Sequence, residues 1–219
     1  MIPANEWWAI LQNYSVSVFP AQILFYLLAI GVLGVFFRHP GIIANRVVKG
    51  FLALVFGWIG VVFFLIHGQG LPAHNAQAFL FLSLSVGFFI DLLIDNNQFL
   101  LHSTGWRRTA TLIGFGLVMF VYPLIGLLLG HPASKWIIPG TFPCPTTALA
   151  LIFMSTTFPI KRQWLYLITL GLLLIWAIPF PIMIQIPQFG VYEDGVMLAA
   201  GIYALIVLPL NWKKSKDIS

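Results

Sequence analysis

The chain has 219 residues, of which 60% are hydrophobic and only 8% are charged, and its formal net charge is +5. Soluble domains carry about 25% charged residues, so a soluble globular protein and a disordered chain are both excluded. The single cysteine excludes a disulfide scaffold, and the scattered basic residues favour contact with lipid headgroups rather than with nucleic acid.

The N-terminal segment predicts a short helix that lies at the membrane surface. Residues 4–14 contain Trp7, Trp8 and Tyr14, whose rings favour the headgroup layer. No Lys or Arg precedes Tyr14, so a cleaved signal peptide is not expected.

Seven apolar stretches follow, and each reaches or approaches the roughly 20 residues that a helix needs to cross a bilayer. They are residues 16–37, 50–66, 76–94, 110–130, 145–160, 163–184 and 191–210. Their apolar residues are continuous rather than alternating, which excludes a membrane β-barrel. The sequence therefore predicts an all-α polytopic transmembrane bundle with seven spans, in a single domain that covers residues 1–219.

The basic residues predict how this bundle is oriented. Seven crossings with an external N-terminus place nearly all of them in the cytoplasm and leave Lys135 outside. The cytoplasmic set is Arg38, Arg46, Lys49, Arg107, Arg108, Lys161, Arg162, Lys213, Lys214 and Lys216. We therefore expect an inner-membrane protein whose C-terminus is cytoplasmic.

Asp91 and Asp95 are the acidic residues at the cytoplasmic end of the third stretch. Their spacing of four residues places both carboxylates on one helical face. They form either a cation or proton site, or an anchor that pairs with Arg38, Arg46 or Arg107.

The external loops collect His67, His131 and Cys144, with Glu193 and Asp194 before the last stretch. Imidazole, thiolate and carboxylate groups are ligands of zinc and copper. No pair has a tight ligand spacing, so a metal ion at His67, His131 and Cys144 is one alternative and water-exposed loop histidines are the other. No further cofactor is predicted.

Residues 131–147 contain four prolines, two of which flank Cys144. Proline restricts its own backbone and that of the preceding residue, so we expect a stiff turn that leads into a helix capped near Thr146. This segment either forms a polar pocket at the external mouth of the bundle or seals the outer surface.

The sequence Pro-Cys-Pro-Thr-Thr at 143–147, Gly-His-Pro at 130–132, Val-Phe-Pro-Ala-Gln at 18–22 and the lone His67 carry a family resemblance. On these residues the chain resembles, over nearly its whole length, a bacterial multi-pass membrane family known as domain of unknown function 6064. The resemblance implies a membrane location and a hydrophobic architecture. It implies no activity and no catalytic residues, and it directs attention to His67, His131 and Cys144.

Three functions stay open. The first is a small transporter or channel-like permease for a small solute or ion, with His67, His131, Cys144 and Thr146 in an external vestibule and Asp91 and Asp95 at the inner end. The second is a non-catalytic subunit or assembly factor of a membrane complex, and a homo-oligomer belongs to the same class. The third is a membrane enzyme or metal-binding protein that uses Cys144. No lysine is expected inside a span, which excludes a retinal Schiff base, and no ATPase, serine hydrolase or zincin motif is present.

Overall fold

The computed structural model describes residues 2–101, 104–132, 135–160 and 162–216, with side chains in the last helix described as far as Trp212. Lys161 and the side chains of Lys213, Lys214 and Lys216 lie outside the described residues. The helical elements are α1 (Ala4–Ser17), α2 (Ala21–Arg38), α3 (Ile42–Trp58), η1 (Ile59–His67), α4 (His74–Ile94), α5 (Trp106–Gly116), η2 (Leu117–Val121), α6 (Tyr122–Leu128), α7 (Pro143–Ser155), α8 (Gln163–Ala177), η4 (Pro181–Gln185), α9 (Ile186–Phe189) and α10 (Asp194–Lys216). The strands are β1 (Asn97–Phe99) and β2 (Thr157–Ile160).

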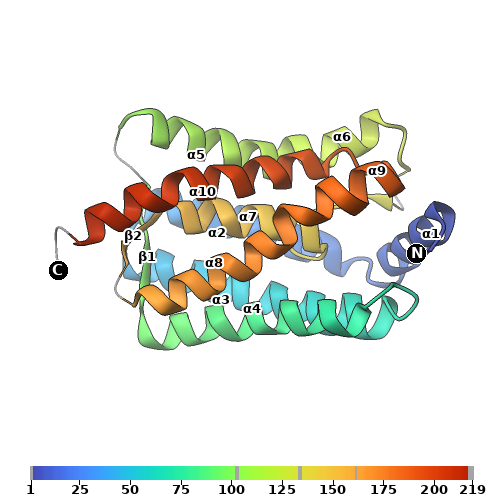
Figure 1. Cartoon of the computed structure of the whole chain (residues 1–219), viewed down its shortest axis with the longest axis horizontal. Coiled ribbons are helices and arrows are strands. Elements are labelled where there is room, and N and C mark those ends of the chain that lie inside the picture. The colour runs from blue at the N-terminus through green and yellow to red at the C-terminus, as the bar shows by residue number, and fades with distance from the viewer. Residues whose placement is uncertain (1, 102–103, 133–134, 161, 217–219) are drawn as a thin grey trace.

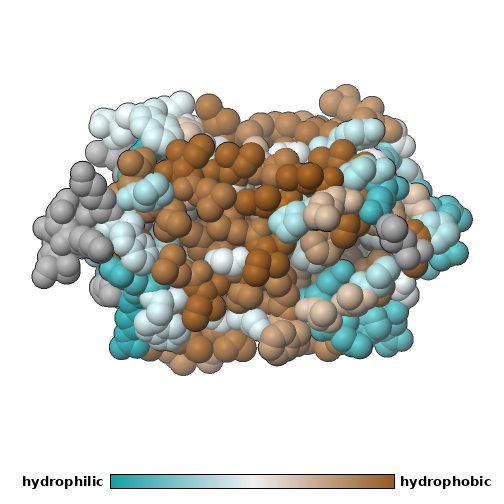
Figure 2. Space-filling model, viewed as in Figure 1, coloured by the Kyte–Doolittle hydropathy of each residue, from teal (hydrophilic) through white to brown (hydrophobic). Residues whose placement is uncertain are grey.

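The molecule is a bundle of helices that run roughly parallel to its long axis (Figure 1). Six of the described helices are long and apolar enough to cross a membrane. They span Ala21–Arg38, Ile42–His67, His74–Ile94, Trp106–Leu128, Gln163–Phe189 and Asp194–Trp212. Figure 2 shows hydrophobic residues over the middle of the visible face and hydrophilic residues toward both ends, as expected of a protein surrounded by lipid. The predicted all-α membrane bundle is confirmed.

The two ends of the bundle differ. One end carries α1, α9 and the N-terminus, and the other carries β1, β2 and the C-terminus (Figure 1). We refer to them as the α1 end and the ribbon end. At the ribbon end β1 pairs antiparallel with β2, with Asn97 opposite Ile160 and Phe99 opposite Thr157.

The stretch predicted as the fifth span forms a short, central helix instead. Helix α7 has 13 residues, which corresponds to about 20 Å of helix and is less than the ~30 Å hydrocarbon thickness. All of its residues are buried, and it ends before β2. The expected boundary at residue 160 is wrong because the backbone leaves the helix after Ser155 to pair with β1.

The second long helix begins earlier than the sequence pattern predicts. Its first residue is Ile42 rather than Gly50, so Arg46 and Lys49 lie within it. The expectation that no lysine lies within a span is therefore wrong. Lys49 is tolerated there, fully buried, because α4 supplies its counter-charges.

Lys49 joins α3 to the end of α4 through a buried ion cluster. Its Nζ lies 3.2 Å from Oδ1 of Asp91 and 3.0 Å from Oδ1 of Asp95. The Asp91 carboxylate also accepts hydrogen bonds from the backbone N–H groups of Asn96 and Asn97, at 3.0 and 2.8 Å, and from the Asn97 side chain at 2.6 Å. A lysine of α3, rather than one of the arginines considered from the sequence, is thus the cation that the two acids share.

This cluster predicts a large loss of stability when Lys49 is removed. The variant Lys49→Met leaves the buried Asp91 carboxylate without its cation, so we expect the free energy of unfolding to fall by about 3–5 kcal/mol. Unfolding in detergent, followed by circular dichroism, measures it. Arg46→Met serves as the matched control, since Arg46 is exposed on the same helix. An equal loss in both variants would contradict the assignment.

Candidate functional site

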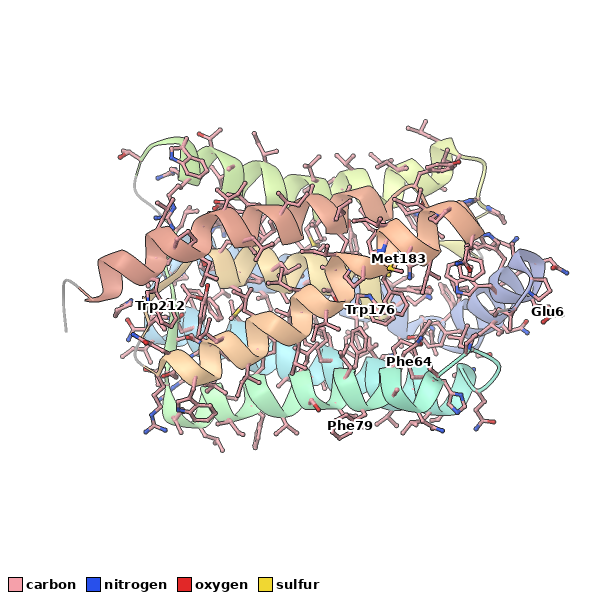
Figure 3. The ribbon with its side chains drawn as sticks, viewed as in Figure 1. Glu6, Phe64, Phe79, Trp176, Met183 and Trp212 are labelled. Atoms are coloured by element: carbon pink, nitrogen blue, oxygen red, sulfur yellow. The ribbon has the colours of Figure 1, made fainter. Side chains whose placement is uncertain are left out.

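A cavity of about 290 Å³ lies inside the bundle at the α1 end. Its wall is built by α1, η1, α4, α6, α7, α8, η4, α9 and α10 together with the loops 68–73 and 137–142. Seven aromatic residues contribute to the wall, in addition to Tyr122: Trp7, Phe63, Phe64, Phe142, Trp176, Phe180 and Phe189. Figure 3 shows Phe64 and Trp176 in the interior of the molecule, and their ring centroids lie 5.9 Å apart. The cavity is therefore mainly apolar, which is typical of a small-molecule site.

A small set of buried polar side chains faces this cavity. The Tyr122 hydroxyl donates a hydrogen bond to Oδ1 of Asp194, and the Cys144 thiol donates to Oε1 of Gln185 at 3.1 Å. All four residues line the cavity and are at least nine-tenths buried. They come from α6, α7, η4 and α10, so the fold brings together groups as far apart in sequence as Tyr122 and Asp194.

Two buried polar atoms of the wall lack a hydrogen bond among the described residues. They are Oδ2 of Asp194 and the indole Nε1 of Trp176, and the Cys144 thiol is the polar group near both of them. A buried polar group without a partner costs about 1–3 kcal/mol. Such atoms in a cavity wall favour a ligand that interacts with them.

The wall segment 137–142 is non-helical backbone held inside the bundle by side-chain hydrogen bonds. Thr146 accepts a hydrogen bond from the Gly140 N–H at 2.8 Å and donates to the Phe142 carbonyl at 2.6 Å. The Tyr14 hydroxyl donates to the Thr141 carbonyl at 2.9 Å. Helix α7 already begins at Pro143, without a side-chain cap, so Cys144 and Thr146 lie in its first turns. The expected turn through residue 147 and the cap near Thr146 are therefore wrong.

Three of the long helices change from α-helical to π-helical geometry beside the cavity. Phe63 and Phe64 come from η1, Ile184 and Gln185 come from η4, and Tyr122 directly follows η2. A π-helical turn shifts the side chains that follow it around the helix axis and occurs frequently at functional sites. These segments therefore help to direct the side chains of the wall.

His131 and Glu193 form a second polar group at the α1 end. Nδ1 of His131 lies 3.5 Å from Oε1 of Glu193, and the imidazole ring lies 4.4 Å from the Trp8 ring between centroids. Burial raises the pKa of Glu193. Burial, and then the nearby charge of Lys135, lower the pKa of His131. Both shifts favour the neutral forms, so this contact is not a strong ion pair.

Of the residues proposed from the sequence, Cys144 lines the cavity. His67 packs against the Tyr14 ring, and Thr146 holds the wall segment 137–142 in place. Asp91 and Asp95 lie at the ribbon end and do not line the cavity. Among the described residues no three His, Cys, Asp or Glu side chains are grouped so that they could hold a metal ion, and His67, His131 and Cys144 have separate neighbours.

Sequence reasoning did not assign Tyr122, Trp176 or Gln185 to a site. Tyr122 and Trp176 lie within long apolar stretches, where Tyr and Trp also occur as ordinary membrane residues, and Gln185 directly follows the stretch 163–184. Gln185 offers a signal in retrospect, because a polar amide within an apolar helix favours a buried hydrogen-bond partner.

The long apolar helices, the hydrophobic surface and the internal cavity define a multi-pass integral membrane protein. A family model described as a family of unknown function (DUF6064) matches residues 4–216, and the chain belongs to that family. The resemblance noted in the sequence is thus confirmed. No curated protein and no solved structure shows significant similarity to the chain.

The backbone at Gly140 predicts that this wall segment requires glycine. Its φ of +101° is unfavourable for other residues, and a Cβ atom there would lie 2.9 Å from Cβ of Phe25. We expect Gly140→Ala to lower the free energy of unfolding by about 1–3 kcal/mol. Gly31→Ala is the control, because Gly31 is helical and a Cβ atom there would have no neighbour within 4 Å, and helix propensity favours alanine at such a position. Thermal unfolding in detergent measures both, and equal effects would contradict the strain at Gly140.

Proposed function

We propose that the protein is a small transporter or permease of the inner membrane whose solute binds in the cavity at the α1 end. The supporting observation is the combination of an apolar, aromatic wall with the buried polar cluster of Tyr122, Cys144, Gln185 and Asp194. A structural core would instead fill such a space with apolar side chains and leave no polar atom without a partner.

Seven crossings are part of this proposal. Helix α7 is too short to span the bilayer by itself, but the preceding segment 137–142 is also buried. This segment contains a turn at 139–141 and lies on the α1 side of α7, so we propose that it and α7 together make one crossing. The opposite positions of the two termini in Figure 1 agree with an odd number of crossings.

The basic residues support the orientation. The described Arg38, Arg46, Arg107 and Arg162 lie in or beside elements that meet at the ribbon end, whereas Lys135 lies near Trp8 at the α1 end. The positive-inside tendency then places the ribbon end in the cytoplasm and α1 at the external surface. The cavity is outward-facing in this arrangement.

Transport also requires a change in the packed interior between the cavity and the ribbon end. Aromatic side chains fill this region, including Phe56 stacked on Phe88 with ring centroids 5.6 Å apart, and Phe36 against Phe153. The π-helical segments η1, η2 and η4 are the proposed points of rearrangement, since their hydrogen-bonding pattern differs from that of the flanking α-helices. Asp91 and Asp95, held by Lys49, form the proposed inner end of the pathway.

An uptake assay tests this function without assuming the charge of the solute. Proteoliposomes are incubated with three labelled aromatic solutes: benzyltrimethylammonium as a cation, benzenesulfonate as an anion and phenylalanine as a zwitterion. We expect saturable uptake of at least one. Ile184→Trp narrows the cavity and should reduce that uptake by about tenfold, corresponding to ~1.4 kcal/mol. Ile182→Trp, at an exposed position of the same π-helical segment, should have little effect.

Failure of uptake would decide against this function. If no solute enters faster than into protein-free liposomes, the transport proposal fails. The cavity is then a structural feature, and a role as a subunit of a larger complex becomes the better explanation.

A further inference from the structure

We propose that the cavity binds a hydrophobic organic cation, that is, an ammonium or similar ion carried on an apolar or aromatic body, with Asp194 as its counter-ion. This inference rests on the proposed function, because it names the solute class for the same cavity.

Asp194 is a buried acid that has no cation beside it among the described side chains. It is fully buried and lines the cavity, and Oδ1 accepts the hydrogen bond from Tyr122. Oδ2 has no hydrogen-bond partner, and no Lys, Arg or His in the described part of the chain forms an ion pair with this carboxylate. Asp91 provides the contrast, because its buried carboxylate has both a cation and three hydrogen-bond donors. A cationic ligand would favour the ionised form of this carboxyl group and serve as its counter-charge.

The titratable groups near Asp194 provide no cation that would compete with a positive ligand. Burial lowers the pKa of His131 and raises that of Glu193, so both favour their neutral forms. Lys135 lies over the Trp8 ring, 5.5 Å from its centroid, rather than against either acid. The first turn of α10 supplies only about half of a positive charge. The site therefore favours a positive ligand and disfavours an anion.

The aromatic wall suits an organic rather than an inorganic cation. Trp176 stacks on Phe180 with centroids 3.9 Å apart, and Phe64 meets Trp176 edge-on at 5.9 Å. Aromatic faces attract organic cations, and an apolar wall accommodates the body that carries the charge. A small metal ion is disfavoured, since no group of three metal-ligating side chains occurs among the described residues. A neutral solute would fill the space but would leave Asp194 without a counter-charge.

Calorimetry on the full chain in lipid nanodiscs tests the proposal. The probe is benzyltrimethylammonium, and the competitor is neopentylbenzene, which has the same shape with a carbon in place of the charged nitrogen. We expect saturable binding of the cation that the neutral isostere does not displace. Asp194→Asn keeps the shape and an acceptor for Tyr122 but removes the charge, and it should weaken cation binding roughly tenfold or more. Glu6→Gln is the matched control, because Glu6 is an exposed acid on α1 (Figure 3).

A second variant keeps the test valid if Asp194→Asn does not fold. Trp176→Leu removes an aromatic face of the wall, so it should weaken binding of the cation more than binding of the neutral isostere. The inference is overturned if the neutral isostere displaces the cation at a similar concentration, or if Asp194→Asn binds the cation as the natural sequence does. If only the neutral isostere binds, the cavity is a ligand site, but the proposal that its ligand is a cation is rejected. Absence of binding by both probes, together with absence of uptake in the liposome assay, rejects the proposed function as well.

Discussion

The structure depends on one constraint, which is that backbone polar groups inside a bilayer must be satisfied by the protein. The segment 137–142 is a buried part of the described core that meets this constraint without being helical. Thr146 and Tyr14 supply hydrogen bonds to it, and the surrounding helices exclude lipid from it. The chain enters the core through this turned segment, and the cavity lies beside it and the first turn of α7.

The two buried groups of acids show how the same residue types serve different purposes. Asp91 is compensated by Lys49 and by nearby amides, and this cluster joins α3, α4 and β1 at the ribbon end. Asp194 accepts a hydrogen bond from Tyr122 but has no counter-cation among the described side chains. A compensated charge stabilises the helix packing, whereas an uncompensated one beside a cavity favours a ligand.

The sequence predicted what depends on local hydrophobicity. Six long apolar helices occur near the predicted positions, because length and apolar content alone determine whether a helix is compatible with lipid. The start of α3 at Ile42 was missed because a charged residue such as Lys49 normally indicates the end of a membrane span. In the structure, Asp91 and Asp95 neutralise its charge. The boundary after Ser155 was missed because the pairing of β1 with β2 joins segments about 60 residues apart, which no local pattern records.

The candidate site was less accessible from sequence for the same reason. The flanking prolines drew attention to Cys144 in the sequence. Tyr122, Trp176 and Gln185 line the same cavity as Cys144 only because α6, α7, α8 and η4 pack together. Their significance lies in a buried contact and in unpartnered atoms, which are properties of the packing.

The most direct test of the proposed outward-facing, cation-binding cavity uses the single cysteine as its reporter. Cys144 lines the cavity, and the variant Cys144→Ala gives the background. Spheroplasts and inside-out vesicles are treated with two methanethiosulfonate reagents, one with a trimethylammonium group and one with a sulfonate group. We predict that Cys144 is labelled in spheroplasts. When the labelling rate of each reagent is divided by its rate with a free thiol, the cationic reagent should be the faster of the two. Labelling that occurs only in inside-out vesicles, or that is at least as fast with the anionic reagent, would contradict this orientation and charge.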